Sequence, residues 1–125
     1  MLCRGLASIS DGEEQSTAYA IYAGDTMVGF IMYNHTPLDP DDPWDSDSYN
    51  IWKLMIDENH QGKGYGRQSL LEVIAEMKTM PKGSAKYIDV HVNPENVAAM
   101  KLYNSLGFAD SGLRDDDEIV LRMNI

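Results

Sequence analysis

The chain has 125 residues, of which 43% are apolar, and this length and composition indicate one soluble domain with a real core. No apolar run approaches the ~20 residues of a membrane-spanning helix, and the N-terminus has no apolar stretch typical of a signal peptide. The net charge of −10 disfavours nucleic acid as a partner and favours a cation. The single cysteine, Cys3, excludes an internal disulfide and fits a reducing compartment, so we expect a cytoplasmic protein.

The first half of the chain has the pattern of a β-meander that follows an irregular lead-in over residues 1–18. Tyr19–Ala23 and Thr26–His35 are strand-like runs, rich in β-branched and aromatic residues, and Gly24–Asp25 between them fits a two-residue hairpin turn. Gly29 within the second run indicates a bulge or the close approach of another backbone.

Residues 37–48 combine prolines with clustered aspartates, which excludes a ladder strand and predicts a solvent-exposed loop. One interpretation is a plain solvated connection. The other is an acidic lip that attracts a multiply charged amine, with Asp39, Asp41 and Asp42 as substrate-binding residues.

The strongest functional signal lies between Leu54 and Arg67. A buried-strand pattern over Ile51–Ile56 gives way to a polar turn and then to three glycines at alternate positions, ahead of a helical pattern over Arg67–Met80. Glycines before a helix start let backbone N–H groups bind phosphate. The spacing fits neither the nucleotide-triphosphate loop nor the dinucleotide fingerprint. An ordinary flexible loop is the alternative.

The second half of the chain predicts a strand, a helix and a last strand. Tyr87–Val92 follows the first helix, so its strand should lie parallel to the strand before the glycines, with a ligand site at their carboxyl ends. Asn93 fits the N-cap of the next helix, and Gly107 fits its C-terminal cap. Residues 110–117 indicate an acidic turn, and Ile119–Met123 a closing strand.

Two signatures resemble those of the GNAT superfamily of acetyl-CoA-dependent N-acetyltransferases. Gln61-x-x-Gly64-x-Gly66 is similar to the pyrophosphate-binding motif of that superfamily. The later block, Asn-x-x-Ala followed by Leu-Tyr-x-x-x-Gly-Phe, is matched by Asn96, Ala99, Leu102, Tyr103, Gly107 and Phe108. Within the superfamily, the hairpin, strand and loop look most like those of spermine/spermidine acetyltransferases.

This resemblance implies an α+β fold over one domain, residues 19–125. Its mixed central sheet would combine an antiparallel N-terminal hairpin and meander with a parallel pair at the cofactor site, flanked by helices. Fewer residues precede the hairpin than the family has there. The chain would then be a truncated member, or another subunit, for example in a homodimer, would complete the acceptor site.

The resemblance also implies acetyl-CoA as the cofactor, and we expect no metal. The pantetheine arm would pair with the backbone of Leu54, Met55 and Ile56, with the Met55 N–H polarising the thioester. Tyr103, on an apolar helical stripe that would equally suit a core residue, would donate a proton to the thiolate. The pyrophosphate and the remaining cofactor contacts would be held by Gln61, Gly62, Lys63, Gly64, Gly66, Arg67, Asn93 and Asn96, although helix capping also explains both asparagines.

The sequence does not identify the residue that acts as the general base. Many relatives carry Glu or His on the strand before the glycine loop, but Asn50 and Trp52 stand near those positions here. His35, His91 and Glu118 remain, and each also suits a surface or strand role; a water chain that ends on an acidic side chain is a further candidate.

The predicted function is transfer of an acetyl group from acetyl-CoA to a primary amine, with a polyamine such as spermidine or spermine as the acceptor. One alternative acceptor is a protein amine or another small amine. A non-catalytic, acyl-CoA-binding homologue is the alternative from another class.

Overall fold

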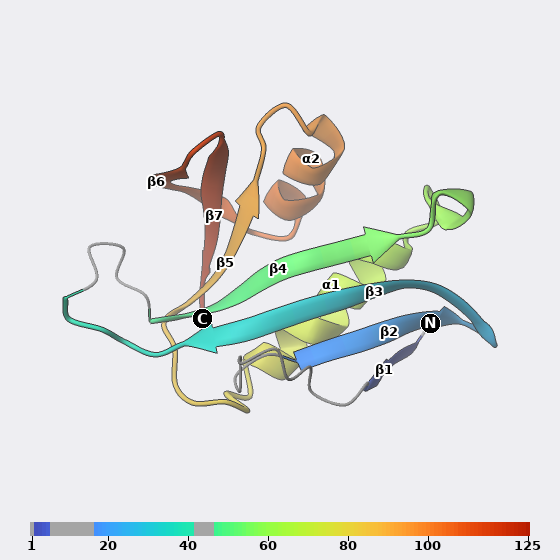
Figure 1. Cartoon of the computed structure of the whole chain (residues 1–125), viewed down its shortest axis with the longest axis horizontal. Coiled ribbons are helices and arrows are strands. Elements are labelled where there is room, and N and C mark those ends of the chain that lie inside the picture. The colour runs from blue at the N-terminus through green and yellow to red at the C-terminus, as the bar shows by residue number, and fades with distance from the viewer. Residues whose placement is uncertain (1, 6–16, 42–46) are drawn as a thin grey trace.

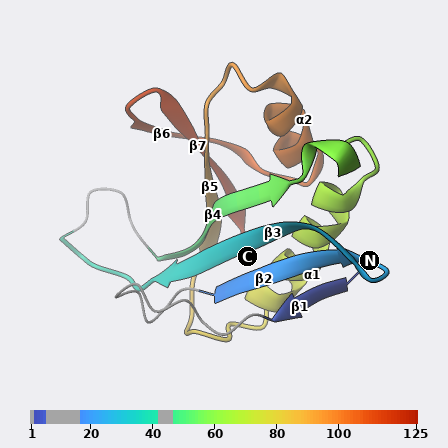
Figure 2. The same cartoon turned by 45° about the vertical axis from the view of Figure 1, so that its right-hand side comes forward.

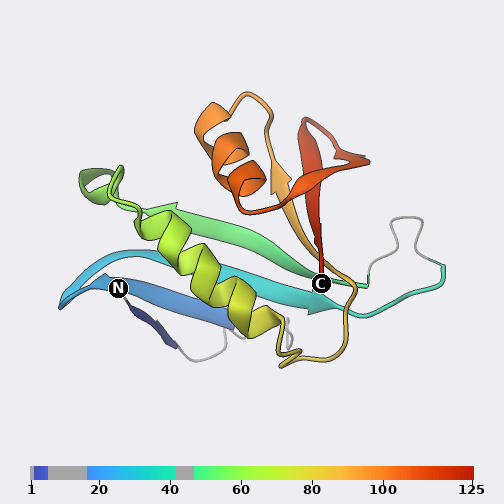
Figure 3. The same ribbon diagram turned by 180° about the vertical axis from the view of Figure 1, so that it is seen from behind.

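The computed structural model describes residues 2–5, 17–41 and 47–125. Within them, seven strands form one mixed sheet in the order β1-β2-β3-β4-β5-β7-β6, and helices α1 and α2 lie on the same side of it (Figure 1, Figure 2 and Figure 3). This arrangement confirms the predicted α+β class with its parallel pair, β4 and β5. The elements are β1 (Leu2–Gly5), β2 (Thr17–Ala23), β3 (Thr26–Thr36), β4 (Ser48–Ile56), η1 (Glu58–His60), α1 (Tyr65–Met77), β5 (Tyr87–Val92), α2 (Val97–Ser105), β6 (Ala109–Asp115) and β7 (Glu118–Asn124).

The predicted irregular lead-in over residues 1–18 is wrong at both of its ends. Leu2–Gly5 forms strand β1, which pairs antiparallel with β2, and β2 itself begins at Thr17. Residues 6–16 lie outside the described part of the chain. Backbone hydrogen bonds to one neighbour hold an edge strand, so its sequence need not show the apolar alternation on which the prediction relied.

The predicted hairpin and the close approach at Gly29 are both confirmed. β2 and β3 turn at Gly24–Asp25, with Gly24 at φ +62°. A Cβ at Gly29 would lie 2.1 Å from the carbonyl oxygen of Met55 in β4, so only glycine fits there. The β2–β3 register also shifts beside Gly29, between Ile21 and Tyr22.

One apolar cluster fills the space between the helices and the sheet. Ile88, Val90 and Val92 of β5 belong to it, together with residues of α1 and α2. Because side chains alternate along a strand, Asp89 and His91 project to the other side. We call these two sides the helix face and the opposite face. None of the described helices is long and apolar enough to cross a membrane.

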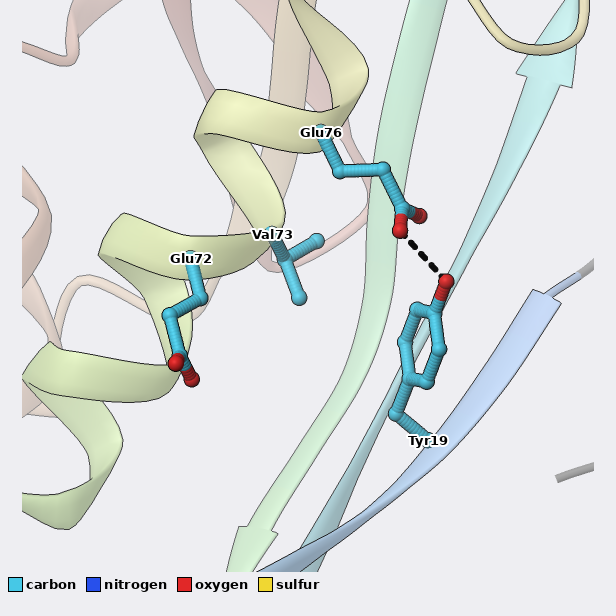
Figure 4. Close-up of a pocket in the computed structure, with 4 residues that line it drawn as sticks. All are labelled: Tyr19, Glu72, Val73 and Glu76. Atoms are coloured by element: carbon cyan, nitrogen blue, oxygen red, sulfur yellow. Dashed lines mark hydrogen bonds between the residues drawn. The ribbon is translucent and has the colours of Figure 1, made fainter. Parts of the chain in front are cut away.

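A carboxylate fastens the later half of α1 to the sheet. Glu76 accepts hydrogen bonds from the hydroxyl of Tyr19 (2.5 Å) and from that of Tyr33, and burial together with this contact raises the pKa of Tyr33 above its ordinary range. Figure 4 shows the Tyr19 contact in a pocket of about 140 Å³, also lined by Glu72 and Val73. This pocket lies beside the later half of α1 and not at the glycine loop.

Residues 110–117 are mostly strand rather than the predicted acidic turn. They form β6 and the start of its hairpin with β7, and the turn itself is confined to Asp116 and Asp117. The β6–β7 register is irregular between Asp110 and Arg114, where Gly112 has φ +88°. This irregularity interrupts the alternation by which a strand is recognised in a sequence.

Candidate active site

The sheet opens between β4 and β5. The two strands pair in parallel only at their beginnings, and the last pair is Ile51 with Val90. Among the strands that the structure describes, β4 continues to Ile56 with only β3 beside it, and β5 continues to Val92 with only β7 beside it. In Figure 1, β4 and β5 diverge from a shared start and α2 lies over the opening. We call this opening the split.

Two hydrogen bonds establish which backbone groups at the end of β4 face the split. The N–H of Asp57 donates to the carbonyl oxygen of Val28 at 2.7 Å, so Asp57 faces β3. The side-chain amide of Gln61 donates to the carbonyl oxygen of Ile56 at 2.9 Å, so Ile56 faces away from β3.

This orientation corrects the expected thioester contact. Successive residues of a strand direct their backbone groups to opposite neighbours. Leu54 therefore shares the direction of Ile56, towards the split, whereas Met55 faces β3, in agreement with its carbonyl oxygen lying against Gly29. The N–H groups of Leu54 and Ile56, and not that of Met55, are directed at the space beside β4.

The glycine loop lies where β4 ends and α1 begins (Figure 2). Gly62 and Gly64 have φ values of +78° and +84°, which L side chains rarely adopt, and Gly64 is the N-cap of α1. In the described part of the chain, no acceptor for the N–H groups of residues 62–67 is found. Unpaired donors that converge at a helix start favour an anion.

The side chains predicted at this loop have different partners. Gln61 uses its amide on Ile56 and thereby fastens the loop to the end of β4. Arg67 donates to the hydroxyl of Ser105 at 2.7 Å, which joins the first turn of α1 to the last residue of α2. Lys63 is exposed, and no ion pair links it to another described residue, so it contributes positive charge next to the unpaired donors.

Helix α2 begins three residues later than predicted. Asn96, not Asn93, is the N-cap, because its side-chain oxygen accepts the N–H of Ala99 at 3.1 Å. Asn93 accepts the N–H of Glu95 at 2.9 Å, within the turn that precedes the helix. Both predicted cofactor residues thus use their side-chain oxygens on the local backbone.

Tyr103 projects from α2 into the helix face, where it is 6% exposed and packs edge-to-face on Phe108 with ring centroids 5.6 Å apart. As predicted, Gly107 ends the helix in a Schellman arrangement: Phe108 donates to the Tyr103 carbonyl and Gly107 to the Asn104 carbonyl. Burial raises the pKa of Tyr103 to about 12, so its hydroxyl stays protonated at neutral pH.

The acidic residues predicted to bind substrate lie at the other end of β4. Asp39 and Asp41 are exposed, and the side chain of Asp39 accepts the N–H of Asp41 at 2.9 Å. Asp42 lies outside the described residues. The structure therefore does not bring this loop next to the glycine loop: they are at opposite ends of β4, and the split begins between them (Figure 1).

Among the candidate bases, His91 and Glu118 lie on the opposite face, His91 on β5 beside the split and Glu118 on the next strand, β7. His91 Nδ1 is 3.0 Å from a carboxylate oxygen of Asp115, and ligand-type atoms of His91, Asp115 and Glu118 lie within 4.8 Å of one another. Asp115 was not predicted from the sequence as a site residue, because no local pattern links it to His91, which lies 24 positions earlier. His35 is buried, with Nε2 3.0 Å from the carbonyl oxygen of Ser84.

Comparison with known families agrees with this geometry. Residues 5–108 match the family described as "Acetyltransferase (GNAT) family". The chain belongs to this family.

Two relatives differ in the acceptor that their names state. The chain is 35% identical over 98 residues to spermine/spermidine N(1)-acetyltransferase of Bacillus subtilis (strain 168), an alignment that covers 75% of the chain and 59% of that protein. It is 32% identical over 92 residues to the N-alpha-acetyltransferase RimI of Mycobacterium tuberculosis, which covers 74% of the chain and 51% of that protein. The chain thus spans between a half and three fifths of the length of these relatives.

Solved structures share the fold at low sequence identity. The PaiA N-acetyltransferase of Thermoplasma acidophilum, in complex with coenzyme A, superposes with a TM-score of 0.71 at 17% identity, covering 89% of this chain and 62% of that one. An IAA acetyltransferase of Bacillus cereus has a TM-score of 0.74 at 18% identity and covers 99% of both chains.

Proposed function

We propose that this protein transfers the acetyl group of acetyl-CoA to a primary amine, with the pantetheine arm of the cofactor in the split. The observation that carries this proposal is the end of β4–β5 pairing at Ile51 and Val90, beyond which no other described strand pairs with β4 on that side. An amide-bearing arm laid along this edge would replace the missing strand. Membership of the GNAT family and the coenzyme A-bound relative support the same conclusion.

The two ends of the cofactor would meet different groups. The N–H groups of residues 62–67 would receive the pyrophosphate, with Lys63 and Arg67 as nearby positive charge. At the reacting end, the N–H of Leu54 is nearer than that of Ile56 to the point where the strands part, so it would polarise the thioester carbonyl.

Tyr103 would stabilise the departing sulfur from the helix face. Its buried hydroxyl is protonated at neutral pH and is available to donate a hydrogen bond to the developing thiolate. With a pKa of about 12, against ~8.5 for an ordinary thiol, complete proton transfer is uphill by roughly 4 to 5 kcal/mol in the unliganded site. Donation of the hydrogen bond would therefore precede full transfer of the proton.

A polyamine is the acceptor that the observations favour. Similarity to a spermine/spermidine N(1)-acetyltransferase supports it, and so do the net charge of −10 and the exposed carboxylates of Asp39 and Asp41 before β4. A protein α-amine is the second candidate, which the similarity to RimI supports. The cytoplasmic location and the homodimer stay predictions from the sequence.

Replacement of Gly64 by alanine should weaken coenzyme A binding by roughly 5- to 30-fold. A left-handed conformation costs a residue other than glycine about 1 to 2 kcal/mol, so the loop of the free variant would leave this conformation. Coenzyme A binding would have to restore the left-handed conformation, and the affinity would fall by that cost. Gly24→Ala is the matched control, because Gly24 is also left-handed and also has open space at its Cβ, but it lies in the β2–β3 turn. Calorimetry should show unchanged affinity for Gly24→Ala; equal losses in both variants would contradict the proposed loop.

Tyr103→Phe should lower kcat for thiol release from acetyl-CoA by on the order of a hundredfold. Only the hydroxyl is removed, and no hydrogen bond joins it to another described residue, so the variant should fold and bind coenzyme A normally. Tyr22→Phe, on β2 away from the split, is the control. An unchanged kcat for Tyr103→Phe would refute the role assigned to Tyr103.

The acceptor is identified by measuring thiol release from acetyl-CoA with polyamines, monoamines and peptides and comparing the rates. If a polyamine is the substrate, Asp39→Asn and Asp41→Asn should each raise KM for spermidine several-fold, and added salt should do the same, because exposed charges attract a polycation through solvent. Asp25→Asn, in the exposed β2–β3 turn, should change nothing. Selective turnover of a peptide would reject the polyamine in favour of the protein amine.

A further inference from the structure

The proposed reaction also needs a group that takes a proton from the acceptor amine, and no residue has yet been assigned to this role. Primary alkylamines are protonated at neutral pH, and an ammonium has no electron pair with which to attack a thioester. Asp89, which also projects to the opposite face, is held by Arg122 at 2.8 and 2.9 Å. It is therefore already paired with a cation.

His91 stands where a proton acceptor is needed. It follows Val90, the last residue of β5 that pairs with β4, so it is the first residue of β5 beside the split. Val90 and Val92 pack in the core on the helix face, which places His91 on the opposite face. Tyr103 lies on the helix face. His91 and Tyr103 therefore belong to the two different faces of the sheet.

Asp115 prepares the imidazole for this role. Nδ1 of His91 lies 3.0 Å from the Asp115 carboxylate, which can only accept, so Nδ1 carries the hydrogen and the lone pair is at Nε2. The same carboxylate stabilises the imidazolium once a proton arrives. Glu118 opposes Asp115 in the β6–β7 register, adds a second negative charge on this face, and favours the approach of an ammonium.

From this geometry we infer that His91 is the general base of the reaction and that Asp115 is its positioning residue, an assignment that rests on the proposed acetyl transfer. The acceptor ammonium gives one proton to Nε2 of His91, and the free amine forms the C–N bond to the acetyl carbon. The C–S bond then breaks with its electron pair on sulfur. The second proton lost from nitrogen balances the one that sulfur gains through Tyr103 and solvent, and His91 returns its proton to water.

The charged groups around His91 define what a pH profile would report. Asp115 and Glu118 face it from β6 and β7, and Asp89 with its partner Arg122 lies two residues away on the same face. Asp117 is in the same hairpin turn but is exposed, so Asp117→Asn removes one local charge without touching the pair.

The test is steady-state thiol release by the full chain between pH 6 and pH 10, with the amine that the wild type uses best. His91→Gln should lower kcat/KM at least a hundredfold near neutral pH, and the deficit should shrink as pH rises and free amine accumulates. Asp115→Asn should lose about tenfold in kcat at an unchanged KM, and Asp117→Asn should match the wild type. Imidazole added to His91→Ala should restore part of the rate.

Several outcomes would overturn the assignment. One is a His91→Gln variant that folds, binds coenzyme A and turns over like the wild type. Another is a wild-type rate that is abolished by EDTA and restored by Zn²⁺, since His91, Asp115 and Glu118 would then be metal ligands. If the wild type released no thiol with any amine, the proposed function itself would fail, which distinguishes the two results.

Discussion

The constraint on which the structure depends is the early end of pairing between β4 and β5. Where this pairing stops, backbone donors and acceptors beside β4 have no strand partner within the described part of the chain. Such groups are satisfied by water in the free protein and offer a template for an extended, amide-bearing ligand. The contact of Arg67 with Ser105 joins the first turn of α1 to the last residue of α2.

The two faces of the sheet differ in chemistry, and the split connects them. The helix face is apolar and carries Tyr103 at the capped end of α2, with a hydroxyl that burial keeps protonated. The opposite face carries His91 with two carboxylates. The proposed proton donor and the proposed proton acceptor therefore belong to different faces of the sheet, and the reacting atoms would meet between them in the split.

Local features of the sequence predicted local features of the structure. The turn at Gly24–Asp25, the close approach at Gly29, the glycine loop and the cap at Gly107 each depend on backbone conformations that few residues adopt. Features that depend on partners distant in sequence were missed. β1 and β6 are held by pairing with other strands, and the direction of the Met55 backbone follows from its register with β3. The contact of His91 with Asp115 likewise requires the β6–β7 hairpin to fold against β5.

The central claim, that coenzyme A lies along the free edge of β4, is tested most directly by residue-resolved amide hydrogen exchange with and without saturating coenzyme A. The orientation of β4 predicts that the amides of Leu54 and Ile56 become strongly protected by the ligand. The amide of Met55, already directed at β3, should change little. Unaltered exchange at both Leu54 and Ile56, in a protein shown by calorimetry to be fully bound, would contradict the account.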